Sequence, residues 1–119
     1  MKKLNIIKKQ DEINNVIKNG KMLKNKFYFL YYINKERELS KYYRFCICVS
    51  KKLGNAVIRN KNKRQIKDII DKSNLVFKSN LDYVIILRKE ISSVSFDEKK
   101  KYLLELLCKL EGENNEEQN

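Results

Sequence analysis

The segment from Val49 to Lys67 decides the fold of this 119-residue chain, and it reads V-S-K-K-L-G-N-A-V-I-R-N-K-N-K-R-Q-I-K. The pattern predicts a strand that ends at Val49, a turn that contains glycine, and a basic helix that opens on Arg59 and fades at residues 71–74. At about 100° per residue, one arc of this helix carries Arg59, Asn60, Lys63, Arg64 and Lys67. The neighbouring arc carries Ile58, Ile66, Ile69 and Ile70. One edge thus faces a core and the next presents cations, as in a nucleic-acid-binding helix.

The charge is unevenly distributed along the chain. Residues 1–67 hold 19 basic and 4 acidic residues, a net charge of +15, whereas residues 68–119 have a net charge of −3. Such a basic segment favours an anionic polymer or a membrane surface over a small acidic ligand. A helix face that is merely solvated would alternate its signs, yet Asp and Glu are absent from residues 51–67.

The composition favours a cytoplasmic protein. No apolar run approaches the roughly 20 residues of a membrane span, and the N-terminus lacks the apolar core of a secretory signal. The three cysteines, Cys46, Cys48 and Cys108, are an odd number without a disulfide framework. We therefore expect a reducing location.

Length and periodicity predict one domain over residues 1–111, which its basic helix suits to nucleic acid, followed by a disordered acidic tail over residues 112–119. Helices are expected at residues 11–18, with Gly20 free to take a positive φ after it, and from Ser95, where Ser95 and Glu98 fit a capping box. Strands are expected at residues 27–33, 43–49 and 82–88, with residues 34–41 as a hairpin between the first two. These elements indicate a small α+β sandwich of two layers, in which three helices lie against one mostly antiparallel sheet.

Groups that could perform catalysis are scarce. The chain has no histidine, the commonest general base and metal ligand. Cys46 and Cys48 share one strand face, but no second ligand pair stands at zinc-site spacing, so a buried structural role is expected for both. Asp97, Glu98 and Glu105 are interpreted as helix caps and surface charges. We expect no catalytic residue and no metal site in this chain.

The motif S-K-K-L-G-N-A-V-I-R-N-K-N-K-R resembles the signature of the protein component of bacterial ribonuclease P. The likeness extends to the early helix that ends at Asn19-Gly20, to F-Y-F-L-Y-Y, to D-Y-V-I-I-L-R-K and to the helix after S-F-D-E. It implies a left-handed β-α-β crossover, against the general right-handed rule. It also implies an accessory subunit that binds the catalytic RNA and the 5′ leader of precursor tRNA. The RNA, with bound Mg²⁺, would then hydrolyse the phosphodiester bond that frees the mature 5′ end, with no membrane and no small-molecule substrate involved.

The resemblance also implies site residues. Its RNA-contacting motif falls on Lys51, Lys52, Arg59, Asn60, Lys61, Lys63, Arg64 and Lys67. Lys61 replaces an arginine that is usual in the family, which keeps the charge but loses the planar fork. The family's leader cleft corresponds to Ile13, Ile17, Phe29 and Tyr31. Aromatic strands and the i, i+4 spacing of helical isoleucines are also typical of core residues, so a core role stays open for these four.

Two other functions remain compatible with the residues alone. One is a ribosomal or RNA-chaperone protein that uses the same basic helix. The other is a stand-alone nuclease, which the missing histidine and the lack of a carboxylate cluster disfavour.

Overall fold

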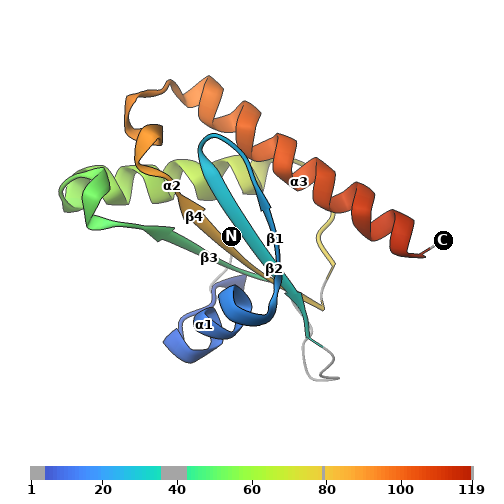
Figure 1. Cartoon of the computed structure of the whole chain (residues 1–119). Helices are drawn as coiled ribbons and strands as arrows, with labels where there is room; N and C mark the ends of the chain where they lie inside the picture. Colours follow the sequence, from blue (N-terminus) through green and yellow to red (C-terminus); the bar gives the residue numbers. More distant parts are fainter. Residues whose placement is uncertain (1–4, 36–42, 79, 119) are drawn as a thin grey trace.

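The computed structural model describes residues 5–35, 43–78 and 80–118, with side chains as far as residue 110, and shows helices on both sides of a four-stranded sheet (Figure 1). The elements in chain order are α1 (Gln10–Asn19), β1 (Lys21–Lys24), β2 (Tyr28–Asn34), β3 (Arg44–Val49), the 3₁₀ turn η2 (Lys51–Leu53), α2 (Ala56–Lys72), β4 (Leu81–Leu87), the 3₁₀ turn η3 (Lys89–Ser93) and α3 (Phe96–Gln118). The α+β class with three helices is therefore confirmed.

The strands are arranged in the order β1-β2-β4-β3. β1 pairs with β2, and β2 with β4, in antiparallel fashion, whereas β3 runs parallel to β4 and is joined to it through α2. The sheet is thus mostly antiparallel, as predicted. The expected hairpin between residues 27–33 and 43–49 is wrong, because β4 lies between those two strands. β4 is apolar on both faces, and such a strand belongs at the centre of a sheet.

The crossover through α2 is present, and its left-handed sense stays a prediction of the resemblance. The segment before α1 also reaches the outer edge of β3. There the N–H of Ile7 donates to the carbonyl of Phe45 at 2.9 Å, and Nδ2 of Asn5 donates to the carbonyl of Tyr43 at 2.7 Å. Part of this edge is therefore covered by the chain itself.

Helices cover both faces of the sheet. On one face, α2 and α3 bury the larger core, which includes Tyr28, Leu30, Tyr83 and Ile85 of the strands. On the other face α1 buries a smaller cluster, made of Ile7, Ile13, Val16 and Val84. Alternate residues of β2 and β4 point to opposite faces, so both clusters draw on the same strands. The single helical layer expected from the sequence is thus supplemented by α1, which forms a partial third layer (Figure 1).

Side chains and one glycine define the starts of the two long helices. The Asn55 side chain accepts a hydrogen bond from the N–H of Ile58 at 3.0 Å, and Gly54 before it has a φ of 146° that favours glycine. At the start of α3, the hydroxyl of Ser95 accepts from the N–H of Glu98 at 3.2 Å, as the capping box predicts. α3 then continues to Gln118, so the backbone of residues 112–118 is helical where the sequence predicts a disordered tail.

The end of α1 differs from its prediction. Gly20 has a φ of −81° and an extended backbone, so it does not use the left-handed region. Its N–H donates to the carbonyl of Val16 at 2.8 Å. A Cβ at this position would lie 2.5 Å from the carbonyl oxygens of both Val16 and Tyr32. Glycine is required here because two backbone segments approach closely.

We expect the substitution Gly20→Ala to lower the free energy of unfolding by about 1–3 kcal/mol, since the backbone must move to admit the methyl group. Urea unfolding measures this loss. Asn19→Ala, at an exposed position next to it, is the matched control and should change stability by less than about 0.5 kcal/mol. Equal stability of the two variants would contradict the close approach at Gly20.

Candidate nucleic-acid interface

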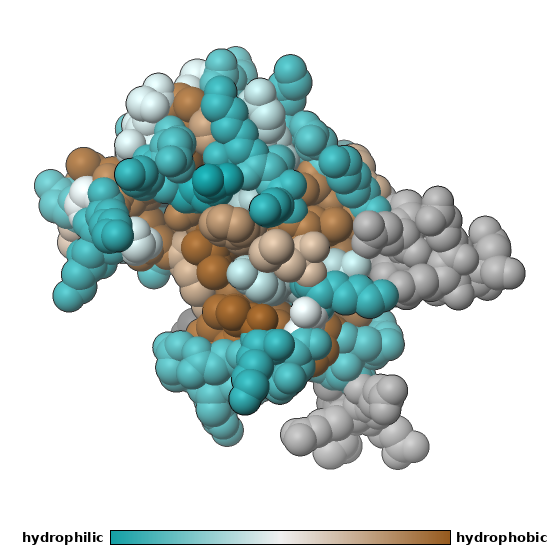
Figure 2. All heavy atoms as spheres, in the orientation of Figure 1, coloured by the Kyte–Doolittle hydropathy of each residue, from teal (hydrophilic) through white to brown (hydrophobic). Residues whose placement is uncertain are grey.

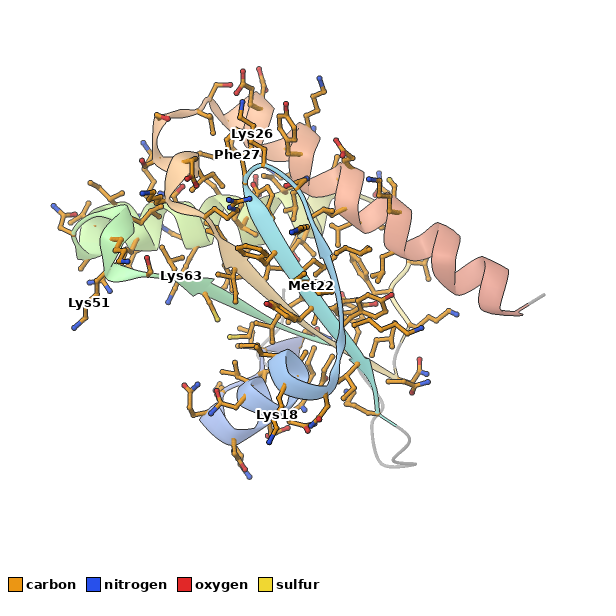
Figure 3. All side chains as sticks on the ribbon, in the orientation of Figure 1. Lys18, Met22, Lys26, Phe27, Lys51 and Lys63 are labelled. Carbon is orange, nitrogen blue, oxygen red and sulfur yellow. The ribbon has the colours of Figure 1, made fainter. Side chains whose placement is uncertain are left out.

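The basic residues of η2 and α2 form one surface of the molecule, here called the basic face. It consists of Lys51, Lys52, Arg59, Asn60, Lys61, Lys63, Arg64 and Lys67. Arg59, Lys63 and Lys67 repeat every four residues and are partly buried, because this row lies toward the sheet. The other five side chains are exposed. Figure 3 shows Lys51 at the turn before α2 and Lys63 farther along, beside β3.

The seven cations of the basic face form no ion pair with any residue in the described ranges, although Lys72 at the end of the same helix pairs with Asp68 at 3.2 Å. Arg59 also has a buried Nε with no hydrogen-bond partner among these residues. Cations that no carboxylate neutralises are available to phosphate oxygens, whose binding releases counterions. The arrangement is thus suited to a polyanion.

Apolar side chains on the opposite side of α2 pack against the sheet and hold this helix in place. Ile66, Ile69 and Ile70 are buried against the sheet, whereas Ile58 is 40% exposed and does not belong to this stripe. Val57, at the start of the helix, is 73% exposed. The predicted apolar arc therefore holds for its last three members and fails at the first turn, where α2 projects beyond the core.

A buried lysine, which the sequence did not reveal, also joins α3 to α2. Lys99 is 6% exposed, and its ammonium donates to Oδ1 of Asn62 at 3.0 Å and to Oε1 of Gln65 at 2.9 Å. Asn62, itself 3% exposed, donates from Nδ2 to the carbonyl of Ile58 at 2.9 Å. Burial lowers the pKa of Lys99, and the nearby cation of Lys61 lowers it further.

Lys99 should make stability depend on pH in the alkaline range. The folded state holds this proton less tightly than the unfolded chain, whose lysine pKa is about 10.4. Between the two pKa values unfolding takes up a proton, so stability rises with pH through that interval. We expect the wild type to gain stability relative to Lys99→Met when urea unfolding is repeated from neutral pH toward about pH 10. If the difference in free energy of unfolding between the two proteins stayed constant with pH, the pKa of Lys99 would not be lowered by folding.

The sheet face that carries α1 remains partly uncovered between α1 and the basic face. Phe29 and Tyr31 of β2, Ile86 of β4, and Cys46 and Cys48 of β3 are partly exposed there. The guanidinium of Arg88 lies over the ring of Phe29, 5.1 Å from its centroid, as in a cation–π contact. Figure 2 shows apolar atoms at the surface above α1, bordered by hydrophilic residues. This surface is called the open sheet face below.

The four predicted leader-cleft residues differ in their exposure to solvent. Phe29, Tyr31 and Ile17 are partly exposed and can contact a ligand. Ile13 is 8% exposed and packs in the smaller core cluster. It therefore has the core role that the sequence left open. Val16, buried beside it, completes the helix stripe that faces the sheet.

An ion-pair network anchors α1 to the sheet. Asp82 of β4 is 4% exposed, and its carboxylate accepts from Nε and Nη2 of Arg44 at 3.0 and 2.7 Å and pairs with Lys35 at 2.9 Å. Arg44 also pairs with Glu12 of α1. The hydrogen bond with Asp82 is the main cause that raises the pKa of Arg44. This ion-pair network could not be predicted from the sequence, because Asp82 lies in an otherwise apolar strand.

The two candidate surfaces adjoin at β3. The ammonium groups of Lys63 and Lys67 are close enough to stabilise negative charge on the thiol of Cys46, and Lys63 acts likewise on Cys48. A ligand on the open sheet face would therefore lie next to cations of α2. Together, the two surfaces offer phosphate contacts beside aromatic and apolar contacts, the combination that single-stranded nucleic acid requires.

No three carboxylate, thiol or imidazole groups among residues 5–35, 43–78 and 80–118 converge to hold a metal ion. Within the same ranges, every helix is too short or too polar for a membrane span.

Known proteins of one family are similar to this chain in both sequence and fold. The family model described as Ribonuclease P matches residues 1–111. The ribonuclease P protein component of Bacillus cereus (strain AH187) is 39% identical over 104 residues, which cover 87% of this chain and 89% of the relative. The RNase P protein of Staphylococcus aureus has a TM-score of 0.76 at 30% identity, covering 87% of this chain and 93% of that one. For the RNase P protein of Thermotoga maritima the TM-score is 0.70 at 31% identity, with 82% and 89% covered. The chain belongs to the ribonuclease P protein family.

Proposed function

We propose that this chain binds the catalytic RNA of ribonuclease P through its basic face and the 5′ leader of precursor tRNA through the open sheet face. In this proposal it is a cytoplasmic accessory subunit, and the RNA hydrolyses the phosphodiester bond that frees the mature tRNA 5′ end. The RNA-binding domain spans residues 1–111.

One observation carries the proposal. Seven cations without an ion-pair partner in the described ranges lie on one surface, and that surface adjoins the open sheet face, which carries partly exposed aromatic side chains. A duplex or folded RNA offers phosphates to the cations. An unpaired leader can in addition stack bases on Phe29 or Tyr31, where each stacked base contributes about 1–3 kcal/mol.

Magnesium belongs to the RNA in this proposal. Among the described residues no three His, Cys, Asp or Glu side chains converge on one point, and the phosphates of an RNA offer the oxygen ligands that Mg²⁺ prefers. The protein's cations would instead offset the repulsion between the phosphates of the catalytic RNA and those of the precursor tRNA. Its contribution should therefore be largest where Mg²⁺ is scarce.

A cleavage assay at low Mg²⁺ tests this role. Purified chain is added to its cognate catalytic RNA and a precursor tRNA, and the release of the 5′ leader is followed. We expect faster cleavage at the correct site, dependent on the catalytic RNA. Cleavage by the protein alone would instead indicate a nuclease, and an unchanged rate of processing would favour a ribosomal or RNA-chaperone protein.

The open sheet face needs a separate assay, because the basic face alone could support cleavage. Tyr31→Ala should weaken binding of precursor tRNA with a leader by about 1–3 kcal/mol and leave binding of mature tRNA unchanged. Tyr102→Ala, an aromatic substitution in α3 on the opposite side of the sheet, is the matched control. Equal losses for both tRNAs would contradict a leader contact at Tyr31.

A further inference from the structure

Two thiols lie side by side on the open sheet face. Cys46 and Cys48 are separated by one residue of β3, so both point to the face that carries α1. Their Sγ atoms are 3.7 Å apart, within hydrogen-bond distance for sulfur, and both side chains are partly exposed. In the sheet they stand opposite Val84 and Ile86 of β4. The sequence pattern had suggested buried, structural thiols, and the partial exposure of both corrects this.

The pair is electrostatically asymmetric. The pKa of Cys48 is lowered to about 7, chiefly by the hydrogen bond with Cys46 and to a smaller extent by the ammonium of Lys63, whereas burial acts in the opposite direction. The pKa of Cys46 is raised, chiefly by the same hydrogen bond and then by burial. A thiolate at Cys48 can therefore form near neutral pH and accept a hydrogen bond from the thiol of Cys46, 3.7 Å away. The thiolate is the nucleophilic form of cysteine, and exchange is fastest when its pKa lies near the ambient pH.

The charges around the two cysteines determine which disulfides are attracted to this thiolate. Lys63 and Lys67 of the basic face lie beside the pair, so the local potential is positive. Small anionic disulfides that carry carboxylates are attracted to such a site, whereas cationic reagents are repelled. Cys108, the third cysteine, is exposed on α3, which packs on the opposite side of the sheet, and offers an internal comparison.

We propose that Cys48 is a thiol–disulfide exchange site for small anionic disulfides, and that its modification closes the open sheet face to RNA. The Cys48 thiolate attacks one sulfur of the disulfide, whose S–S bond breaks as the Cys48 S–S bond forms. The other half leaves as a thiolate, so the small disulfide is the oxidant of the Cys48 sulfur and one of its own two sulfurs is reduced. Cys46 is a positioning residue that donates its S–H to the attacking thiolate. The second part of this proposal, closure to RNA, rests on the proposed function.

Proteins with a single thiol test the chemistry. Cys46→Ser/Cys108→Ser retains only Cys48 and keeps a hydroxyl donor at position 46, whereas Cys46→Ser/Cys48→Ser retains only Cys108. The rate of alkylation by iodoacetamide is measured against pH. We expect a midpoint near 7 for Cys48.

The donor at position 46 is tested by Cys46→Ala/Cys108→Ser, which should move the Cys48 midpoint upward. Identical midpoints for the serine and alanine forms would overturn the proposed site. In the wild-type chain, incubation with glutathione disulfide followed by peptide mapping should find Cys48 modified before Cys108. Earlier modification of Cys108 would also overturn it. Circular dichroism confirms that each protein compared is folded.

The RNA arm uses the Cys48-only protein before and after reaction with glutathione disulfide. We expect the adduct to weaken binding of a precursor tRNA with a leader severalfold, and bound precursor tRNA to slow the modification. The Cys108-only protein, treated identically, should keep its affinity. If Cys48 reacts as expected but RNA affinity is unchanged, closure to RNA is refuted and the exchange site stands. If the unmodified protein binds no RNA, the proposed function fails independently of the thiol chemistry.

Discussion

The double substitution of Arg59 and Arg64 by alanine should weaken binding of the catalytic RNA by about 10- to 100-fold, since each arginine offers charge-assisted hydrogen bonds to phosphate. Both lie on the basic face, and neither pairs with a carboxylate in the described part of the chain. Each lost phosphate contact removes about 0.7–0.9 from the slope of log K against log salt concentration, so the slope should fall by about 1.4–1.8. Filter binding or fluorescence anisotropy over a salt series measures both quantities.

Two controls separate charge from geometry in this experiment. Arg59→Lys/Arg64→Lys keeps the charges and should keep the slope, although affinity falls where a planar fork is needed. Lys72→Ala removes a cation from the last turn of the same helix, where it pairs with Asp68, and should leave the slope unchanged. A wild-type slope in the folded double-alanine protein would exclude phosphate contacts by these arginines.

The largest effect on stability is expected for Asp82→Ala. The substitution leaves the guanidinium of Arg44 and the ammonium of Lys35 without their shared carboxylate at a site that is 4% exposed. Breaking a buried ion pair by removing one partner costs about 3–5 kcal/mol, and the partial exposure of Arg44 favours the lower end of that range. Urea unfolding should therefore show a loss of about 3 kcal/mol.

Asp68→Ala is the matched control for this loss. Asp68 also pairs with a lysine, but both side chains are well exposed, and such pairs contribute less than about 0.5 kcal/mol. Similar losses for Asp68→Ala and Asp82→Ala would show that burial does not strengthen the network. Glu12→Ala should lie between them, because Arg44 then keeps Asp82 and loses only its contact with α1.

The sequence predicted those elements whose local pattern agrees with their final environment. α2 carries its cations and its isoleucines on separate arcs, and β4 is apolar on both faces, so the basic helix and the central strand could both be identified. The capping box at Ser95 was confirmed because it depends only on residues three apart.

Features that depend on tertiary contacts could not be predicted in this way. β1 reads K-M-L-K, which has little strand character, and it forms because β2 offers an edge to pair with. The close approach at Gly20 depends on the carbonyl of Tyr32, twelve residues away. At the site, the grouping of the cations on one face of α2 followed from the sequence. The burial of Ile13 and the pairing of Cys46 with Cys48 required the placement of α1 and the rotamers on β3.

The position of β4 between β2 and β3 has a mechanical consequence. Neighbouring strands lie about 4.8 Å apart, so the aromatic side chains of β2 and the edge strand next to α2 are held roughly 10 Å from each other by backbone hydrogen bonds. A side-chain substitution that leaves the sheet intact therefore leaves the distance between these two strands unchanged. The aromatic rings of β2 and the strand that adjoins the cations of α2 are thus kept at a fixed separation of two strand spacings.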